Sequence, residues 1–154
     1  MSDERITTEE NSSNKNDSIH KKFAGERDDW TTRITGLTER LKSIFDVAEL
    51  LTDLYSQRQI AGDYIHELVA LSSKLNRIYR ERKRERFLHY TQNYDLRLDK
   101  DPKMLFIEVD LADIVERREI LQNHLDFMRE TLRSIDTICY GVKHRIALEE
   151  YRRG

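Results

Sequence analysis

Apolar residues between Trp30 and Tyr55 recur at alternating steps of four and three, with mostly polar residues between them. This spacing places the apolar side chains on one face of an amphipathic helix with a heptad seam. We therefore predict a helix over about residues 28–57. The positions on this first stripe are Trp30, Ile34, Leu37, Leu41, Ile44, Ala48, Leu51 and Tyr55.

A second stripe keeps the same spacing but is shifted in phase near Gly62. The shift predicts either a hairpin that breaks around residues 59–63 or one continuous helix with a stutter. We place this second helix at about residues 62–90. The stripe consists of Ala61, Tyr64, Leu68, Leu71, Leu75 and Ile78.

The third stripe is the most regular and predicts a helix over about residues 110–151. Arg118 is the one charged residue on it; the others are Leu111, Ile114, Leu121, Leu125, Met128, Leu132, Ile135, Cys139, Val142 and Ile146. Extra apolar residues widen the stripe, so this helix is expected to pack against more than one neighbour. We assign the part from Leu121 to Ile146 to contacts between subunits. The alternative is that it packs within the monomer, against residues 30–57.

The remaining segments carry weaker patterns. Residues 1–25 are rich in Ser, Thr, Asn and charge, so we expect a disordered tail before a helical domain of residues 26–154. Residues 91–109 are predicted to form a loop with at most a short strand or turn at Met104–Ile107. Asp110, or Asp101 with Pro102, is expected to cap the last helix.

Composition supports an all-α fold of long amphipathic helices arranged as a helical hairpin or coiled coil. The 154 residues include a single proline and five glycines, so few helix breakers are present. Cys139 is the only cysteine, which excludes an internal disulfide and a cysteine-based zinc site and favours a reducing compartment. With no leader pattern and no apolar run of about 18 residues, we expect a cytoplasmic protein without a membrane span.

The segment from Arg77 to Arg86 is strongly basic. It has net charge +4, whereas the whole chain has net charge −2, which indicates an anionic partner. Because the second stripe ends at Ile78, we expect this segment to be a helix end that the core does not cover. The alternative is an ordinary solvated helix face. Its basic residues are Arg77, Arg80, Arg82, Lys83, Arg84 and Arg86, and the planar side chains that follow are Phe87, His89, Tyr90 and Tyr94.

The sequence shows no pattern of an enzyme or of a bound cofactor. The five histidines never lie four residues apart, so a metal site is not expected. The glycines are isolated from one another, so no glycine-rich phosphate loop is present. Carboxylates are abundant, but on polar helix faces they are usually solvated rather than catalytic.

Short clusters of residues at fixed spacing are also informative. The basic segment combines Arg84, Arg86, Phe87 and Tyr90, and the last helix combines Leu125-Asp126-Phe127, Leu132, Ile135, Val142-Lys143-His144, Tyr151 and Gly154. With these clusters the chain resembles the UvsY family of phage recombination mediators over about residues 30–154. It departs from that family at His89, where a tyrosine is expected, and at Gln92, where a glycine is expected.

The resemblance implies a mediator that binds single-stranded DNA and assembles as a hexameric or heptameric ring. It also implies contacts with a RecA-like recombinase and a single-strand-binding protein, which the recombinase replaces on DNA in the host cytoplasm. Phosphates would meet the six basic residues, and bases would stack on Phe87, Tyr90 or Tyr94. Two other classes remain open: a coiled-coil adaptor that does not bind nucleic acid, and an RNA-binding chaperone.

Overall fold

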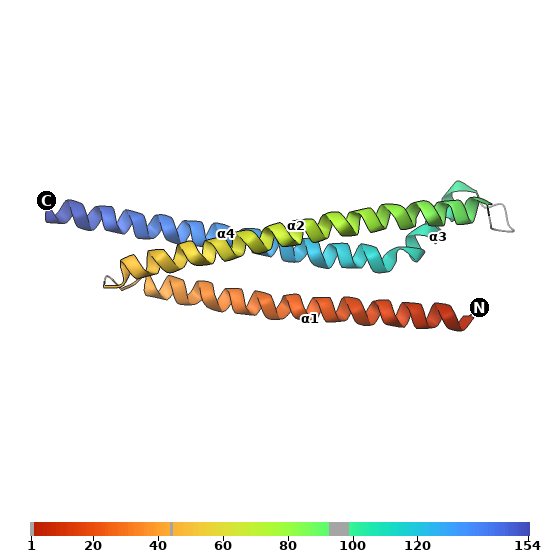
Figure 1. Cartoon of the computed structure of the whole chain (residues 1–154), viewed down its shortest axis with the longest axis horizontal. Coiled ribbons are helices and arrows are strands. Elements are labelled where there is room, and N and C mark those ends of the chain that lie inside the picture. The colour runs from red at the N-terminus through yellow and green to blue at the C-terminus, as the bar shows by residue number, and fades with distance from the viewer. Residues whose placement is uncertain (1, 44, 93–98) are drawn as a thin grey trace. The chain divides into compact units, whose positions relative to one another are not determined.

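A computed structural model describes residues 2–43, 45–92 and 99–154, with side chains from residue 14 onward. The described residues form four helices and no strand, which confirms the all-α fold class (Figure 1). No helix in these ranges is long and apolar enough to span a membrane. The helices are α1 (Ser2–Arg40), α2 (Val47–Gln92), α3 (Lys100–Asp110) and α4 (Ala112–Arg153).

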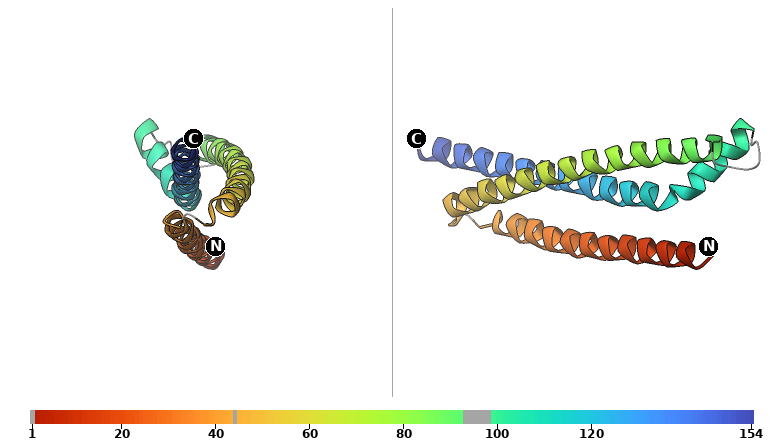
Figure 2. Two further views of the ribbon diagram at one scale, coloured as in Figure 1. Left: turned by 90° about the vertical axis from the view of Figure 1, so that its left-hand side faces the viewer. Right: turned by 45° about the vertical axis from the view of Figure 1, so that its right-hand side comes forward.

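The helices contribute to two compact units, each made of segments that are distant in the sequence. Unit 1 comprises Met1–Lys22 and Val69–Asn123, and unit 2 comprises Phe23–Leu68 and His124–Gly154. Within each unit, a segment of α2 runs antiparallel to segments of α1 and α4 (Figures 1 and 2).

The core of unit 2 follows heptad spacing on α1 and on α2. It contains Phe23, Trp30 and Leu37 from α1 and Leu54, Ala61 and Leu68 from α2, all buried. Residues seven apart return to nearly the same helix face, so each set forms one continuous apolar stripe. Burying a leucine or phenylalanine side chain contributes about 1.5–3 kcal/mol, so these stripes hold the three segments of unit 2 together.

The turn between α1 and α2 is held by one arginine. The guanidinium group of Arg40 lies 2.8 Å from Oδ2 of Asp46 and 2.5 Å from Oδ2 of Asp53. The hydrogen bond from Arg40 is the main cause that lowers the pKa of Asp46. The side chain of Arg40 therefore links the end of α1 to the first turns of α2.

The core of unit 1 is centred where the end of α2 meets α3. Tyr90, Ile107 and Leu111 are buried together, with Tyr79 and Met104 packed against them. The short α3 ends at Asp110 and is capped by Leu111, whose backbone N–H donates to the carbonyl oxygens of Ile107 and Glu108. Apolar packing of unit 1 therefore resumes beyond Ile78, where the second stripe was predicted to end.

The N-terminal segment is helical in the structure and not the disordered tail that we predicted. Residues 2–25 belong to α1, and within this segment Asn16 and Phe23 are buried. The Asn16 amide donates to the backbone oxygen of Asp113 at 3.0 Å and to Oε2 of Glu116 at 2.7 Å. Its oxygen accepts from Nε of Arg117 at 2.9 Å. Because all these hydrogen bonds of the buried Asn16 are formed, the residue stabilises the N-terminal part of α1, which contains few apolar residues.

The helix boundaries also differ from the prediction. Of the two alternatives for residues 59–63, the structure shows the continuous helix, because α2 continues through Gly62, and the break after the first helix lies instead between Arg40 and Val47. A glycine inside a helix costs only about 1 kcal/mol, which the packing of α2 offsets. Residues 100–110 form a helix instead of a loop, so Asp101 and Pro102 lie in the first turn of α3. The predicted loop residues 93–98 lie outside the described residues, and α4 ends within two residues of its predicted bound.

The stripe of α4 that we assigned to subunit contacts is largely part of the core of the single chain. Leu132 and Ile146 are half-buried, whereas the other six residues are at most 6 % exposed. The structure therefore favours the alternative, in which this stripe packs within the monomer. Burial also raises the pKa of the Cys139 thiol. The six buried residues are Leu121, Leu125, Met128, Ile135, Cys139 and Val142.

Candidate nucleic-acid interface

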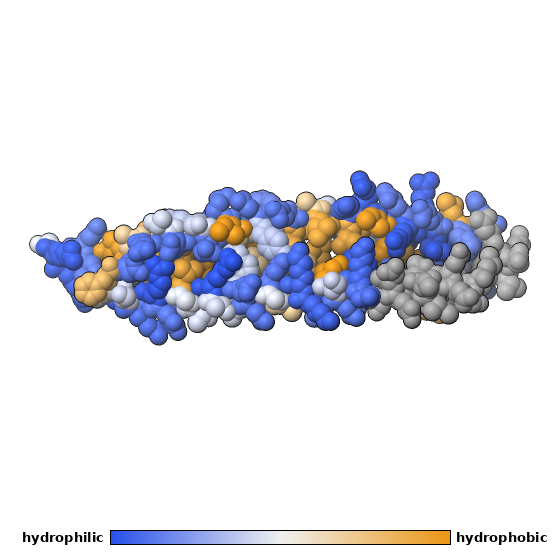
Figure 3. Space-filling model, turned by 60° about the horizontal axis from the view of Figure 1, so that its bottom comes forward, coloured by the Kyte–Doolittle hydropathy of each residue, from blue (hydrophilic) through white to orange (hydrophobic). Residues whose placement is uncertain are grey.

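The basic segment lies on α2 within unit 1, and its side chains differ in what they contact. Lys83 is half-buried, with Nζ 5.7 Å from the centre of the Tyr79 ring. The five arginines of the segment are exposed. A space-filling view shows one face of the molecule, on which hydrophilic side chains predominate and apolar patches lie between them (Figure 3).

Three of the arginines form ion pairs. The nitrogen–oxygen distances are 3.7 Å for Arg77–Glu81, 3.6 Å for Arg82–Asp113 and 3.7 Å for Arg86–Asp110. Exposed pairs of this length contribute about 0–1 kcal/mol, so they can open, but they partly neutralise the segment. The predicted uncovered helix end is therefore covered on one side by acidic residues of α3 and α4.

The other two arginines, Arg80 and Arg84, have no ion-pair partner among the described residues. They are four residues apart, so their side chains project from the same face of α2. Phe87 is three residues further along this face and is 47 % exposed. Nζ of Lys103 lies 5.4 Å from the centre of the Phe87 ring. We call Arg80, Arg84 and Phe87 the arginine–phenylalanine row.

Tyr90 does not belong to an exposed stacking surface, which corrects the prediction. Its side chain is 6 % exposed, and its ring stacks against Phe106 with ring centres 5.8 Å apart. Its hydroxyl donates a hydrogen bond to Asp110. His89 is half-buried against Tyr90, and Tyr94 lies outside the described residues. Of the predicted stacking residues that are described, Phe87 is the most accessible.

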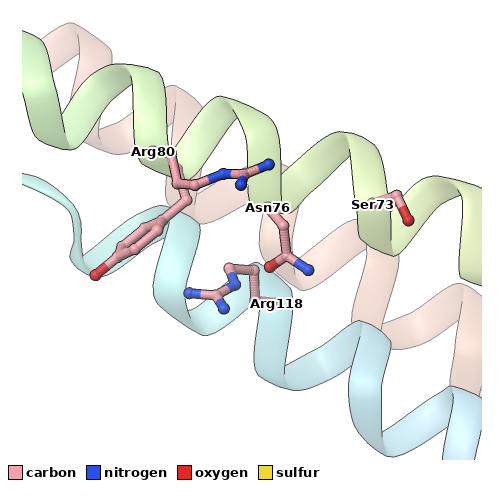
Figure 4. Close-up of a pocket in the computed structure, with 5 residues that line it drawn as sticks. Ser73, Asn76, Arg80 and Arg118 are labelled. Atoms are coloured by element: carbon pink, nitrogen blue, oxygen red, sulfur yellow. The ribbon is translucent and has the colours of Figure 1, made fainter.

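A polar groove opens beside this row in unit 1 (Figure 4). Its volume is about 450 Å³, and Ser73, Asn76, Tyr79 and Arg80 of α2 line it together with Arg118 of α4. The guanidinium carbon of Arg118 lies 4.5 Å from the centre of the Tyr79 ring. We call this the Arg80–Arg118 groove. Our sequence prediction omitted Arg118, although its position as the one charge on the third stripe was a visible signal.

Sequence reasoning also missed a polar cluster in the core of unit 2. Nε2 of His124 lies 2.8 Å from Oε2 of Glu26, and the hydroxyl of Tyr64 donates to the same oxygen at 2.5 Å. Burial, and then the hydrogen bond to Glu26, raise the pKa of Tyr64. The Phe23 ring stacks on His124 at 4.0 Å. The cluster links α1, α2 and α4, and no local sequence pattern brings these residues together.

The described side chains contain no group of three His, Cys, Asp or Glu residues arranged to hold a metal ion. Comparison of the chain with protein-family models, curated proteins and solved structures found no match. The resemblance to the UvsY family therefore rests on the short residue clusters of the sequence.

Proposed function

We propose that this protein binds single-stranded DNA through the arginine–phenylalanine row of α2. The observation that carries the proposal is the pair Arg80 and Arg84, two exposed guanidinium groups on one helix face without a carboxylate partner among the described residues. Their positive charge can meet an anionic ligand without first opening an ion pair, which the three paired arginines would have to do.

The row also supplies a contact for bases. Phe87 lies on the same helix face as Arg80 and Arg84 and exposes 47 % of its surface. Single-strand-binding surfaces combine cations that contact phosphates with aromatic rings on which bases stack. Each such stacking contact is worth about 1–3 kcal/mol and tolerates any base. A single strand exposes its bases for stacking, whereas a duplex keeps them paired, so the row suits a single strand.

The wider role is that of a recombination mediator, and the resemblance to the UvsY family supports it. In this role the protein would help a RecA-like recombinase to replace a single-strand-binding protein on DNA. Several copies of the row in one assembly would bind a long strand more tightly than one copy, because linked weak sites gain avidity. Chemical catalysis is not part of this proposal.

A ring of subunits belongs to the same proposal, but it requires a surface other than the buried stripe of α4. Unit 1 exposes apolar side chains near the end of α2 and on α3, and these are available for contacts between subunits. Apart from Phe87, which the row assigns to DNA, the exposed residues are Leu88, Leu105, Phe106 and Val109. Particle mass measured by light scattering, with and without oligothymidine, tests assembly and its dependence on DNA.

The direct test is binding of fluorescently labelled oligothymidine, followed by anisotropy. Replacing Arg80 and Arg84 together by alanine should weaken binding at least tenfold. The matched control replaces Arg129 and Arg133 of α4, which are exposed and paired with Asp126 and Glu130. This control makes the same change in net charge and should alter affinity less than twofold. Equal losses in both variants would contradict a specific row.

Two other classes give different results in the same assay. A coiled-coil adaptor would not bind oligothymidine at low or moderate salt. An RNA-binding chaperone would bind it, but unlabelled oligouridine would compete better than unlabelled oligothymidine. We expect oligothymidine to be the better competitor.

A further inference from the structure

Arg118 interrupts the apolar stripe of α4 within unit 1. Its neighbours on that stripe, Ile114 and Leu121, are 1 % and 2 % exposed, and Arg118 itself is half-buried. A charge at such a position loses part of its hydration and requires a partner that compensates for the loss.

The side chains opposite Arg118 do not supply a negative charge. Ser73, Asn76 and Arg80 project from one face of α2, and the groove that they line also receives Arg118 from α4 (Figure 4). The fifth residue that lines the groove is Tyr79. Two arginines thus share one groove, and among the described residues neither has a carboxylate oxygen within 4.0 Å.

Tyr79 orients Arg118 without neutralising it. The guanidinium carbon of Arg118 lies 4.5 Å from the ring centre, which is a favourable cation–π distance. In this arrangement the N–H groups of Arg118 remain available to donate hydrogen bonds to a ligand, because the ring face attracts the charge and accepts no conventional hydrogen bond. A guanidinium held in this way loses less conformational freedom when a ligand binds.

We propose that the Arg80–Arg118 groove binds a phosphate group of the single strand. Both guanidinium groups would contact the phosphate oxygens, since the arginine fork matches the geometry of phosphate. The Ser73 hydroxyl and the Asn76 amide are further donors in the groove. This inference rests on the proposed function and adds α4 to the DNA-binding surface.

The groove also extends the path of the strand. Arg80 belongs to both the arginine–phenylalanine row and the groove. A strand that stacks a base on Phe87 and passes Arg84 therefore reaches Arg80 next and then the groove. Arg118 contacts a phosphate at the end of this path, so it increases affinity without selecting a base sequence.

The test compares Arg118→Ala with the wild-type chain in the oligothymidine assay. The variant should bind at least fivefold more weakly, and the slope of log affinity against log salt should become less negative by about 0.7, the value for one phosphate contact on a single strand. Arg118→Lys keeps the positive charge but not the planar set of N–H donors, so its loss of affinity for oligothymidine should be intermediate. The control Arg133→Ala, on the same helix, should bind like the wild type.

A purely structural role of Arg118 predicts a different result. In that case Arg118→Ala, which loses the contact with the Tyr79 ring, would lower the midpoint of thermal unfolding but leave the oligothymidine affinity of the folded variant unchanged. Our proposal predicts instead that the folded variant binds oligothymidine more weakly and with a less negative salt slope, whatever the change in the midpoint. Wild-type affinity in a folded Arg118→Ala variant would overturn the inference.

The assay separates this inference from the proposed function. If Arg80→Ala/Arg84→Ala weakens binding but Arg118→Ala does not, the row stands and the groove assignment is wrong. If the wild-type chain does not bind oligothymidine, both are wrong. Thermal unfolding with inorganic phosphate gives one further outcome. If phosphate raises the unfolding midpoint of the wild type but not of Arg118→Ala, and the wild type does not bind oligothymidine, then the groove binds a free oxyanion. That result would overturn the assignment to a DNA strand.

Discussion

The hydroxyl of Tyr90 donates a hydrogen bond of 2.7 Å to Oδ2 of Asp110, which joins the end of α2 to the last residue of α3. The same carboxylate oxygen lies 3.7 Å from Nε of Arg86. One acidic residue thus contacts both an aromatic and a cationic residue of the predicted DNA-binding set. Because this arrangement buries Tyr90 and pairs Arg86, the exposed binding surface shifts to Arg80, Arg84 and Phe87.

Replacing Tyr90 by phenylalanine should lower the free energy of unfolding without changing DNA affinity. The variant loses a hydrogen bond to a carboxylate, which contributes about 1.5–3 kcal/mol. Urea denaturation followed by circular dichroism measures the loss, and oligothymidine anisotropy measures affinity. Tyr140→Phe is the matched control, because Tyr140 is 78 % exposed. A large loss of affinity with unchanged stability would show that Tyr90 contacts DNA.

The N-terminal part of α1 should contribute to the stability of unit 1. Asn16→Ala removes three hydrogen bonds of a buried amide, so we expect a loss of about 1–3 kcal/mol in unfolding free energy. Asn14→Ala, at an exposed position of the same helix, should have little effect. Equal stability of both variants in urea would favour the disordered tail that the sequence suggested.

The buried stripe of α4 should stabilise the monomer fold. Ile135 is fully buried, so Ile135→Ala should cost about 2–4 kcal/mol of unfolding free energy. The particle mass from light scattering should not change at a temperature where the variant is folded. Leu148→Ala, at a half-exposed position of α4, is the control. Dissociation of an assembly by Ile135→Ala, with unchanged unfolding, would restore the original assignment of the stripe to subunit contacts.

The alkaline stability of the protein should depend on Tyr64. Burial and Glu26 raise the pKa of Tyr64 above its usual value of 10.0, so the folded state retains this proton more strongly than the unfolded state. The contribution is complete below pH 10 and is lost as the pH rises above it. The unfolding free energy of the wild type should therefore fall more steeply above pH 10 than that of Tyr64→Phe. Parallel curves would contradict the raised pKa.

The sequence pattern predicted the helical class because the stripes repeat locally. The heptad Asn16, Phe23, Trp30 and Leu37 extends into the expected tail, but it starts with a polar residue. The partners of Asn16 are about 100 residues away in the sequence, so local periodicity did not reveal that the amide is satisfied. The α4 stripe was predicted correctly as apolar, yet a stripe alone does not indicate whether its partner is the same chain or another copy.

The candidate site was predictable only where it depends on neighbouring residues in the sequence. The charge of the basic segment can be read directly from the sequence, and so can the common helix face of Arg80 and Arg84. The pairing of Arg82 and Arg86 depends on α3 and α4, which contribute Asp110 and Asp113 from a distant part of the sequence. The burial of Tyr90 likewise depends on α3, a helix that the sequence analysis interpreted as a loop.

The salt dependence of oligothymidine binding tests the central claim most directly. Each phosphate contact on a single strand contributes about −0.7 to the slope of log affinity against log salt. Replacing Arg80 and Arg84 together by alanine should therefore make the slope less negative by about 1.4, whereas the Arg129→Ala/Arg133→Ala control should keep the wild-type slope. A wild-type slope near zero, or equal slopes in the wild type and the Arg80→Ala/Arg84→Ala variant, would contradict phosphate binding by the row.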